Sequence, residues 1–268
     1  MEITERRIIY PSRSDVYHLF PVGDIHAGTK HCAEELIKRK VNEIKDDPNA
    51  LWLGMGDHGE FISMNDPRFD IGVISDWVKP DDIVESQRRW IGHLLEPIKD
   101  KCLGLLEGTH EDSCRTHFHG DVHQHICEDL GVPNLGYSAF IKLVFTRVDE
   151  KGNSKLVLCH VQHGSGSAIT IGAKLNKLQK QMLSFDADIY ATGHMHEILT
   201  ITTPYLTLDK QNMIKQKVKV GAVTGSWVRA YTQNVRASYA EKRSYPPTSL
   251  GSPVFVIKPS TGEISVQG

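Results

Sequence analysis

The alternation of short apolar runs with helically spaced apolar residues constrains the fold of this chain more than any other feature of its sequence. The runs VYHLFPVGD (16–24), ALWLGMGD (50–57) and CLGLLEGTH (102–110) have the length and the apolar content of buried strands. Between them, apolar residues recur every three or four positions over 33–44 and over 83–98, as on the buried face of a helix. Strands separated by helices pair in parallel, so this part of the chain predicts an α/β fold.

The pattern changes after a short helix that the sequence predicts over 120–131, closed by Gly131. The runs 138–147 and 154–164 then flank a polar turn, which is typical of a hairpin. A further helix is predicted over 171–184, and further strands over 186–194, 198–208, 215–226, 253–260 and 263–267. Together these elements predict two packed mixed β-sheets flanked by helices, in a single domain that covers residues 1–268.

The composition is ordinary for a globular protein and excludes several classes. No apolar run approaches the roughly 20 residues of a membrane-spanning helix, and the opening MEITERRIIYPSRSD lacks the continuous apolar core of a signal peptide. The five cysteines include no CxxC pair and predict buried reduced thiols. The net charge of -2 gives no overall attraction to nucleic acid. We therefore expect a cytoplasmic protein with no membrane partner.

Carboxylate and imidazole groups stand beside glycines at the ends of the predicted strands. The stretches GDIHAG, GMGDHGE, EGTHED, VQHGSG and TGHMHE supply Asp24, His26, Asp57, His110, His163, His194 and His196. Glycine lets the chain turn sharply there, while the strand fixes the direction of the side chain. His194 and His196 are two positions apart, so their side chains are expected to lean toward the same side.

This set of groups favours a pair of metal ions. Imidazoles and carboxylates without a thiolate prefer divalent ions such as Mn, Fe, Zn, Co or Ni to Ca or Mg. Seven groups are too many for one tetrahedral ion, whereas two ions about 3.5–4 Å apart that share a carboxylate would absorb them. Each motif alone is weak, because an isolated histidine at a strand end is more often structural. The fixed order of all five makes the prediction specific.

The order of these motifs resembles that of the calcineurin-like metallophosphoesterase family, which is DxH, GD, GNHE/D, a lone His and GHxH. The resemblance extends from Asp24 to His196, about two thirds of the chain. The later stretch TGSWVRAYTQ also resembles phage and prophage members of the family. The resemblance implies a β-sandwich of two mixed sheets flanked by helices, and a centre of two divalent transition-metal ions with Mn favoured.

The resemblance also gives each matched residue a role. The metal ligands would be Asp24, His26 and His196 for the first ion, His163 and His194 for the second, and Asp57 as the bridge. Where the family has an asparagine that ligates the second ion, this chain has Thr109, whose hydroxyl is a poorer ligand. Thr109 then binds the second metal through Oγ1, hydrogen-bonds a metal-bound water or a phosphate oxygen, or merely fills space at the turn.

The implied reaction is the attack of a metal-bridging hydroxide, at the ions that Asp57 bridges, on a phosphate ester. His110 would protonate the leaving oxygen or stabilise the charged transition state, and Glu111 would orient the His110 imidazole. Arg115 either binds a nonbridging phosphate oxygen through its planar fork or is an ordinary surface arginine.

The favoured substrate is a phosphodiester of the nucleotide or nucleic-acid type. The alternatives are a phosphomonoesterase and a non-catalytic interaction module that keeps its metal ligands. Retention of His110 favours the enzyme, because a binding scaffold has no chemical need for the acid. The sequence does not predict the oligomeric state.

Several further groups have more than one interpretation. Four histidines either contact substrate, bind a third metal or are plain solvated residues: His117, His119, His123 and His125. His160 lies on the opposite face of its strand from His163, so we expect a buried structural role for it. Three lysines at helical spacing form either a solvated face or a basic stripe for nucleic acid: Lys174, Lys177 and Lys180.

Overall fold

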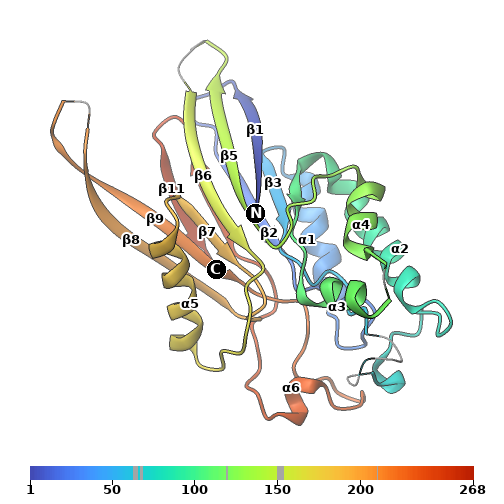
Figure 1. Cartoon of the computed structure of the whole chain (residues 1–268). Helices are drawn as coiled ribbons and strands as arrows, with labels where there is room; N and C mark the ends of the chain where they lie inside the picture. Colours follow the sequence, from blue (N-terminus) through green and yellow to red (C-terminus); the bar gives the residue numbers. More distant parts are fainter. Residues whose placement is uncertain (63–65, 67–68, 119, 150–153, 210) are drawn as a thin grey trace.

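Two β-sheets packed face to face form the centre of the molecule, and helices lie outside them (Figure 1). The computed structural model describes residues 1–62, 66, 69–118, 120–149, 154–209 and 211–268. This arrangement confirms the predicted fold class, an α/β fold of two mixed sheets flanked by helices.

The first sheet has six strands in the order β1-β5-β6-β7-β9-β8. Their bounds are β1 Glu2–Tyr10, β5 Ser138–Arg147, β6 Ser154–Gln162, β7 Ile189–Thr192, β8 Ile198–Leu208 and β9 Ile214–Thr224. Strand β1 is parallel to β5, and β7 is parallel to both β6 and β9. The pairs β5–β6 and β8–β9 are antiparallel, and the sheet is therefore mixed.

The second sheet has five strands in the order β11-β10-β2-β3-β4. Their bounds are β2 Tyr17–Val22, β3 Ala50–Gly54, β4 Cys102–Leu105, β10 Val254–Lys258 and β11 Glu263–Gln267. Strands β2, β3 and β4 are parallel, as the intervening helical patterns predict, whereas β10 is antiparallel to both β2 and β11. Because β2, β3 and β4 run in the same direction, the loops that follow them leave the sheet at the C-terminal ends of these strands.

The helices pack through the apolar stripes that the sequence shows. Their bounds are α1 Glu34–Asp46, η1 Ile71–Val73, α2 Ile83–Leu95, η2 Glu96–Lys101, α3 Thr109–Phe118, α4 Val122–Leu130, α5 Ile171–Ser184 and α6 Tyr239–Lys242. Helix α1 buries Ile37, Val41 and Ile44, which are spaced at three and four positions. Figure 1 shows α1, α2, α3 and α4 beside the second sheet and α5 beside the first.

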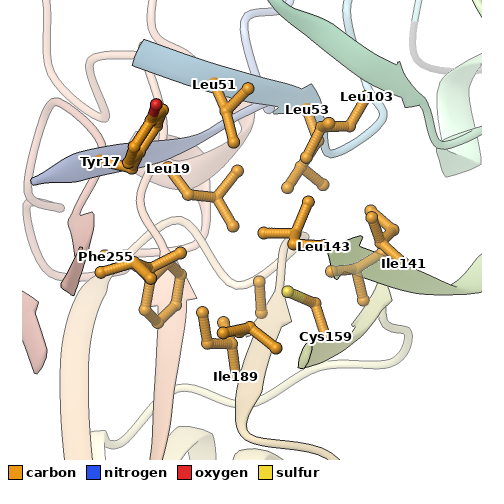
Figure 2. Close-up of a cluster of buried hydrophobic side chains, with 14 of the residues drawn as sticks. Tyr17, Leu19, Leu51, Leu53, Leu103, Ile141, Leu143, Cys159, Ile189 and Phe255 are labelled. Atoms are coloured by element: carbon orange, nitrogen blue, oxygen red, sulfur yellow. The ribbon is translucent and has the colours of Figure 1, made fainter. Parts of the chain in front are cut away.

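The main core fills the space between the two sheets (Figure 2). Leu19 and Leu53 from the second sheet and Leu143 and Ile189 from the first are fully buried in this core. A second apolar cluster lies under α1, α2 and α4, and a third lies under α5. Burial of this apolar surface is the main stabilising contribution, at roughly 25 cal/mol for each Å² removed from water.

Among the described elements, those that the sequence did not predict are β1, η1, α3 and α6. Strand β1 pairs with β5 along the whole of Glu2–Tyr10, although most of its residues are exposed. Helix α3 begins at Thr109, inside the stretch that the sequence analysis treated as a strand end. The turn expected at 148–153 lies largely outside the described residues.

No helix in the described ranges is both long enough and apolar enough to span a bilayer. The five cysteines are buried free thiols, as predicted: Cys32, Cys102, Cys114, Cys127 and Cys159. Burial raises the pKa of the Cys32 thiol and of the Cys127 thiol to about 12. These thiols are therefore protonated and unreactive at neutral pH.

Candidate metal centre

The predicted ligands sit on strained backbone. Five of them adopt positive φ angles between 48° and 67°, namely Asp24, His26, Asp57, His194 and His196. Residues other than glycine rarely adopt this left-handed backbone conformation, which costs on the order of 1–3 kcal/mol for each residue. Such strain persists only where the surrounding structure enforces it, and its concentration at these residues indicates a functional site.

The first group of ligands contains Asp24, His26 and His196. The potential ligand atoms of these three residues all lie within 4.8 Å of one another. Nε2 of His196 lies 3.2 Å from Oδ1 of Asp24 and 3.2 Å from Nε2 of His26. Two imidazole nitrogens at this distance need a proton or a cation between them, because their lone pairs repel each other. The first group therefore fits a divalent ion.

The second group contains Asp57, His163 and His194, whose ligand atoms also lie within 4.8 Å of one another. Nδ1 of His163 lies 2.7 Å from the carbonyl oxygen of Met55, and donation to this oxygen leaves the Nε2 lone pair for a ligand. Nδ1 of His194 is buried and has no hydrogen-bond partner in the described part of the chain, and the buried Nε2 of His163 faces Oδ2 of Asp57 at 3.2 Å. Buried nitrogens without partners are costly unless an ion occupies the position that they face.

Asp57 lies between the two groups. Its Oδ2 is 3.2 Å from Nε2 of His163 in the second group and 3.9 Å from Nε2 of His26 in the first. The same carboxylate oxygen is therefore close to a histidine of each group. Both Asp57 and His163 are almost completely buried, so solvent screens their interaction little.

The electrostatics of two members of the second group, Asp57 and His194, favour the forms that bind metal. Burial by itself would raise the pKa of Asp57, but the positive charges of His163 and then His110 hold it well below its usual value. Burial, followed by the charge of His163, lowers the pKa of His194 to about 4. The carboxylate is therefore ionised and His194 is neutral at pH 7.

His110 stands at the start of α3 and beside both groups. Its backbone N–H donates to Oδ1 of Asp57 at 2.8 Å. Its ring packs edge-to-face against His26, with the ring centroids 4.5 Å apart. Nδ1 lies 2.5 Å from the carbonyl oxygen of Glu60. When Nδ1–H donates to that oxygen, Nε2 is the nitrogen that can gain or lose a proton.

Thr109 contacts the bridging position directly. Its hydroxyl donates to the carboxylate of Asp57, with Oγ1 at 3.1 Å from Oδ2 and 3.3 Å from Oδ1. This geometry shows that Thr109 is more than a space-filling residue at the turn. It places the hydroxyl next to the second group.

Glu111 has a different role from the one expected. Its buried carboxylate accepts hydrogen bonds from the backbone N–H groups of Gly108, Asp57 and His58 at 3.0, 3.0 and 2.7 Å. Burial would raise the pKa of Glu111, but the hydrogen bond and charge of His58 lower it to about 2. The expectation that Glu111 orients the His110 imidazole is corrected, because Glu111 instead holds the loop that carries Asp57.

Arg115 is held by neighbouring acids. Its guanidinium forms ion pairs with Asp112 at 2.6 Å, Glu107 at 3.1 Å and Asp121 at 3.7 Å. These contacts agree with the surface interpretation of Arg115. The structure does not bring it into either ligand group.

Glu60 lies at the site although its sequence position did not predict it. Its Oε2 lies 2.9 Å from Nδ1 of His26, which leaves Nε2 of His26 to face the first group. Together with His26 and His110 it forms a third group of potential ligand atoms within 4.8 Å. The signal was present in GDHGE, where an acid stands three residues after Asp57.

The other histidines whose side chains the structure describes do not join the ligand groups. His160 is fully buried as expected, stacked on Phe185 with ring centroids 3.6 Å apart. His123 is also buried, with Nε2 3.1 Å from Oδ1 of Asn134, whereas His125 is exposed. The side chains of His117 and His119 lie outside the described residues.

Comparison with known proteins finds distant structural likenesses. No family model matches it, and no curated protein matches it. Among solved structures, a conserved uncharacterized protein from Streptococcus pneumoniae TIGR4 titled as a predicted phosphoesterase is 11% identical, with a TM-score of 0.32 over 94% of this chain and 97% of that one. Vps29 from Chaetomium thermophilum is 12% identical, with a TM-score of 0.36 over 96% and 95% of the two chains. Likenesses at these TM-scores carry no conclusion about function.

Proposed function

We propose that this chain is a calcineurin-like metallophosphoesterase that hydrolyses phosphodiester bonds with two divalent metal ions. The observation that carries the proposal is the pair of three-residue ligand groups with Asp57 between them. The motif order DxH, GD, GTHE, His and GHMH supports the family. The five buried free thiols suit a reducing compartment, and we place the enzyme in the cytoplasm.

The residues present fit two such ions. Asp24, His26 and His196 would hold the first, and His163 and His194 with the shared Asp57 would hold the second. Imidazole and carboxylate ligands suit Mn²⁺, Fe²⁺ or Zn²⁺, and we favour Mn²⁺. When bound, such ions activate water near neutral pH and neutralise the phosphate that it attacks.

His110 is positioned to act on the leaving group. Its ring lies beside His26, and its backbone is fixed to Asp57, so it borders both ligand groups without belonging to the two that share Asp57. In the protonated ring, Nδ1–H would stay on the Glu60 carbonyl oxygen and the Nε2 proton would pass to the leaving oxygen, which leaves the ring neutral. General acid catalysis of this kind typically contributes about 10² to 10⁴ in rate.

The charge around the two groups favours a diester over a monoester. A phosphomonoester carries close to two negative charges at pH 7, whereas a diester carries one. Among the described residues, the polar contacts of the two ligand groups involve no lysine or arginine. The carboxylate of Glu60 adds negative charge at His26. A singly charged ester, such as the phosphodiester of a nucleotide or nucleic acid, therefore suits the site better.

The test is a metal-reconstituted activity screen. Bis(4-nitrophenyl) phosphate should be cleaved faster than 4-nitrophenyl phosphate at identical Mn²⁺ loading, and cyclic nucleotides and single- and double-stranded DNA and RNA should then be compared. Asp57→Asn protein purified in the same way controls for contaminating phosphatases. The reverse order of the two nitrophenyl esters would indicate a phosphomonoesterase. Metal binding without hydrolysis of any ester would instead indicate a non-catalytic module.

A further inference from the structure

The three helically spaced lysines of α5 do not form one surface. Lys174 is only 4% exposed, and its Nζ lies 3.3 Å from Oε2 of Glu197. Nζ of Lys177 donates to the carbonyl oxygen of Ser165, and to that of Gly166 at 2.9 Å. Lys180 alone is exposed. The three lysines therefore do not form a basic stripe, because Lys174 is buried in an ion pair and Lys177 is bound to loop carbonyls.

Lys177 holds the loop that follows His163. This loop has no regular secondary structure, and its two glycines adopt positive φ angles of 89° at Gly164 and 69° at Gly166. Carbonyl oxygens outside a helix or sheet need other donors. The hydroxyl of Tyr137 donates to the Gly164 carbonyl at 3.0 Å, and Lys177 supplies the donor for the next two carbonyls.

Helix α5 also holds the loop that carries His194 and His196. Met195, which stands between these histidines, is 7% exposed and belongs to the apolar cluster formed by α5 residues such as Leu178. Glu197, the next residue after His196, is bound on one side by Lys174 and on the other by Ser249, whose Oγ lies 2.6 Å from Oε1. Met195 and Glu197, which alternate with the two histidines, thus fix this loop through contacts made outside the ligand groups.

We propose that α5 is the positioning element for the metal ligands on these two loops, and that it acts through Lys174 and Lys177. The inference rests on the proposed function, which assigns His163 and His194 to the second ion and His196 to the first. A lysine ammonium offers three donors, so Lys177 can donate to two carbonyl oxygens at once. These two bonds hold the loop against the helix. The buried charge of Lys174 fixes Glu197, because moving either group away would leave an unpaired charge.

The first experiment measures metal affinity in the full chain. Chelator-treated wild type, Lys177→Met and Lys180→Met are titrated with Mn²⁺, and the free ion is followed by electron paramagnetic resonance. Lys177→Met should weaken one of the two sites by about 10-fold, the scale typical of residues that orient a ligand. Lys180→Met should match wild type in both affinities, and Lys177→Arg should restore most of the loss.

The second experiment tests Lys174 through its partner. Lys174→Met and Glu197→Gln should each lower Mn²⁺ affinity, and the double variant should lose less than the sum of the two, because both changes break one contact. Hydrogen exchange of residues 163–166 in metal-free protein adds a readout that is independent of activity. It should accelerate in Lys177→Met and remain unchanged in Lys180→Met.

The outcomes separate this inference from the proposed function. Wild-type protein that binds two Mn²⁺ ions but hydrolyses no ester would overturn the proposed activity. The Mn²⁺ affinities of the lysine variants would still test the positioning role of α5. If Lys177→Met and Lys174→Met both bind Mn²⁺ as tightly as wild type, the positioning role is refuted. Wild type that binds no Mn²⁺ would overturn both.

Discussion

Oδ2 of Asp57 lies 3.2 Å from Nε2 of His163, inside a region from which solvent is excluded. Asp57 arrives from the loop after β3 and His163 from the loop after β6, so this contact joins the two sheets. Burial lowers the pKa of His163, but the charge of Asp57 raises it to about 10 in the absence of metal. The contact is thus a proton-mediated pair that a divalent ion would replace.

Loss of the Asp57 charge should abolish binding of the second ion. Asp57→Asn keeps the shape of the side chain but offers a neutral oxygen, which is a weaker ligand than a carboxylate. We expect elemental analysis to find fewer bound ions per chain than in wild type. Asp112→Asn, an exposed carboxylate on α3, is the matched control and should keep the full complement. Equal metal content in the two variants would exclude Asp57 from the centre.

His110→Ala should retain metal and lose turnover. The ring belongs to neither of the two groups assigned to the ions, whereas its proposed proton transfer occurs in the transition state. We expect kcat to fall by about 10² to 10⁴ while the Mn²⁺ content stays the same. His125→Ala, an exposed histidine on α4, should keep full activity. A His110→Ala protein that loses metal but runs at full rate when loaded would make His110 a ligand.

Thr109→Asn should strengthen the second site. The hydroxyl of Thr109 already lies 3.1 Å from Oδ2 of Asp57, so a longer amide side chain at this position could extend a carbonyl oxygen toward the same ion. A Mn²⁺ titration should show tighter binding at one site and no change at the other. Thr116→Asn, an exposed position on the same helix, provides the control. Unchanged or lower affinity in Thr109→Asn would show that threonine causes no deficit.

Gly108→Ala should disrupt the centre by steric overlap. A methyl group at this position would overlap the backbone nitrogen and the carboxylate of Asp57. We expect a loss of about 1–3 kcal/mol in the free energy of unfolding, measured by urea titration, together with a loss of bound Mn²⁺. Gly92→Ala is the control: it lies in α2 with no atom in the way of the methyl group, and it should gain about 0.5–1 kcal/mol. Similar effects of the two changes would mean that the loop around Asp57 adapts easily.

His160 should make the fold sensitive to acid. Burial lowers its pKa to about 4, so the unfolded chain, whose histidine titrates near 6.5, takes up the proton first as the pH falls. The contribution of His160 to stability is therefore complete above about pH 6.5 and is lost as the pH falls toward 4, by at most about 1.4 kcal/mol per pH unit. His160→Phe, which can keep the stacking on Phe185, should reduce the difference in unfolding free energy between pH 7 and pH 4.5. The same change at exposed His125 should have a smaller effect, and an equal effect would contradict the assignment.

The sequence predicted those elements whose burial has a clear period. Strand β5 alternates buried and half-buried residues over Ser138–Arg147, and its bounds match the prediction. Strand β1 was missed because it is an edge strand with most of its side chains exposed. Ile8 and Tyr10 near its end pack on the main core, but Glu2–Tyr10 as a whole shows no clear period of burial. Pairing of the backbone, unlike burial, leaves no trace in the order of polar and apolar side chains.

The site residues likewise divide into those that the sequence predicted and those that depend on tertiary structure. Ligands at strand ends, such as Asp24 and His163, were predicted because a strand fixes where its last side chain points. Glu60 comes from a loop without such a constraint, and its approach to His26 depends on tertiary structure. Glu111 follows His110 in the chain, but successive residues on a helix point about 100° apart. It therefore contacts a different part of the site from its neighbour.

The position of β10 determines when this centre can form during synthesis. Strand β2, which ends just before Asp24, lies between β3 and β10, and the fully buried Leu19 and Phe255 are paired across that second edge. A ribosome has therefore made most of the chain before β2 gains its second neighbour. Pairings between such distant segments are slow, because loop closure costs entropy before the contact stabilises the fold. Until residues 254–258 emerge, one hydrogen-bonding edge of β2 has no strand beside it, and an unpaired strand edge is a site of aggregation in a partly made chain.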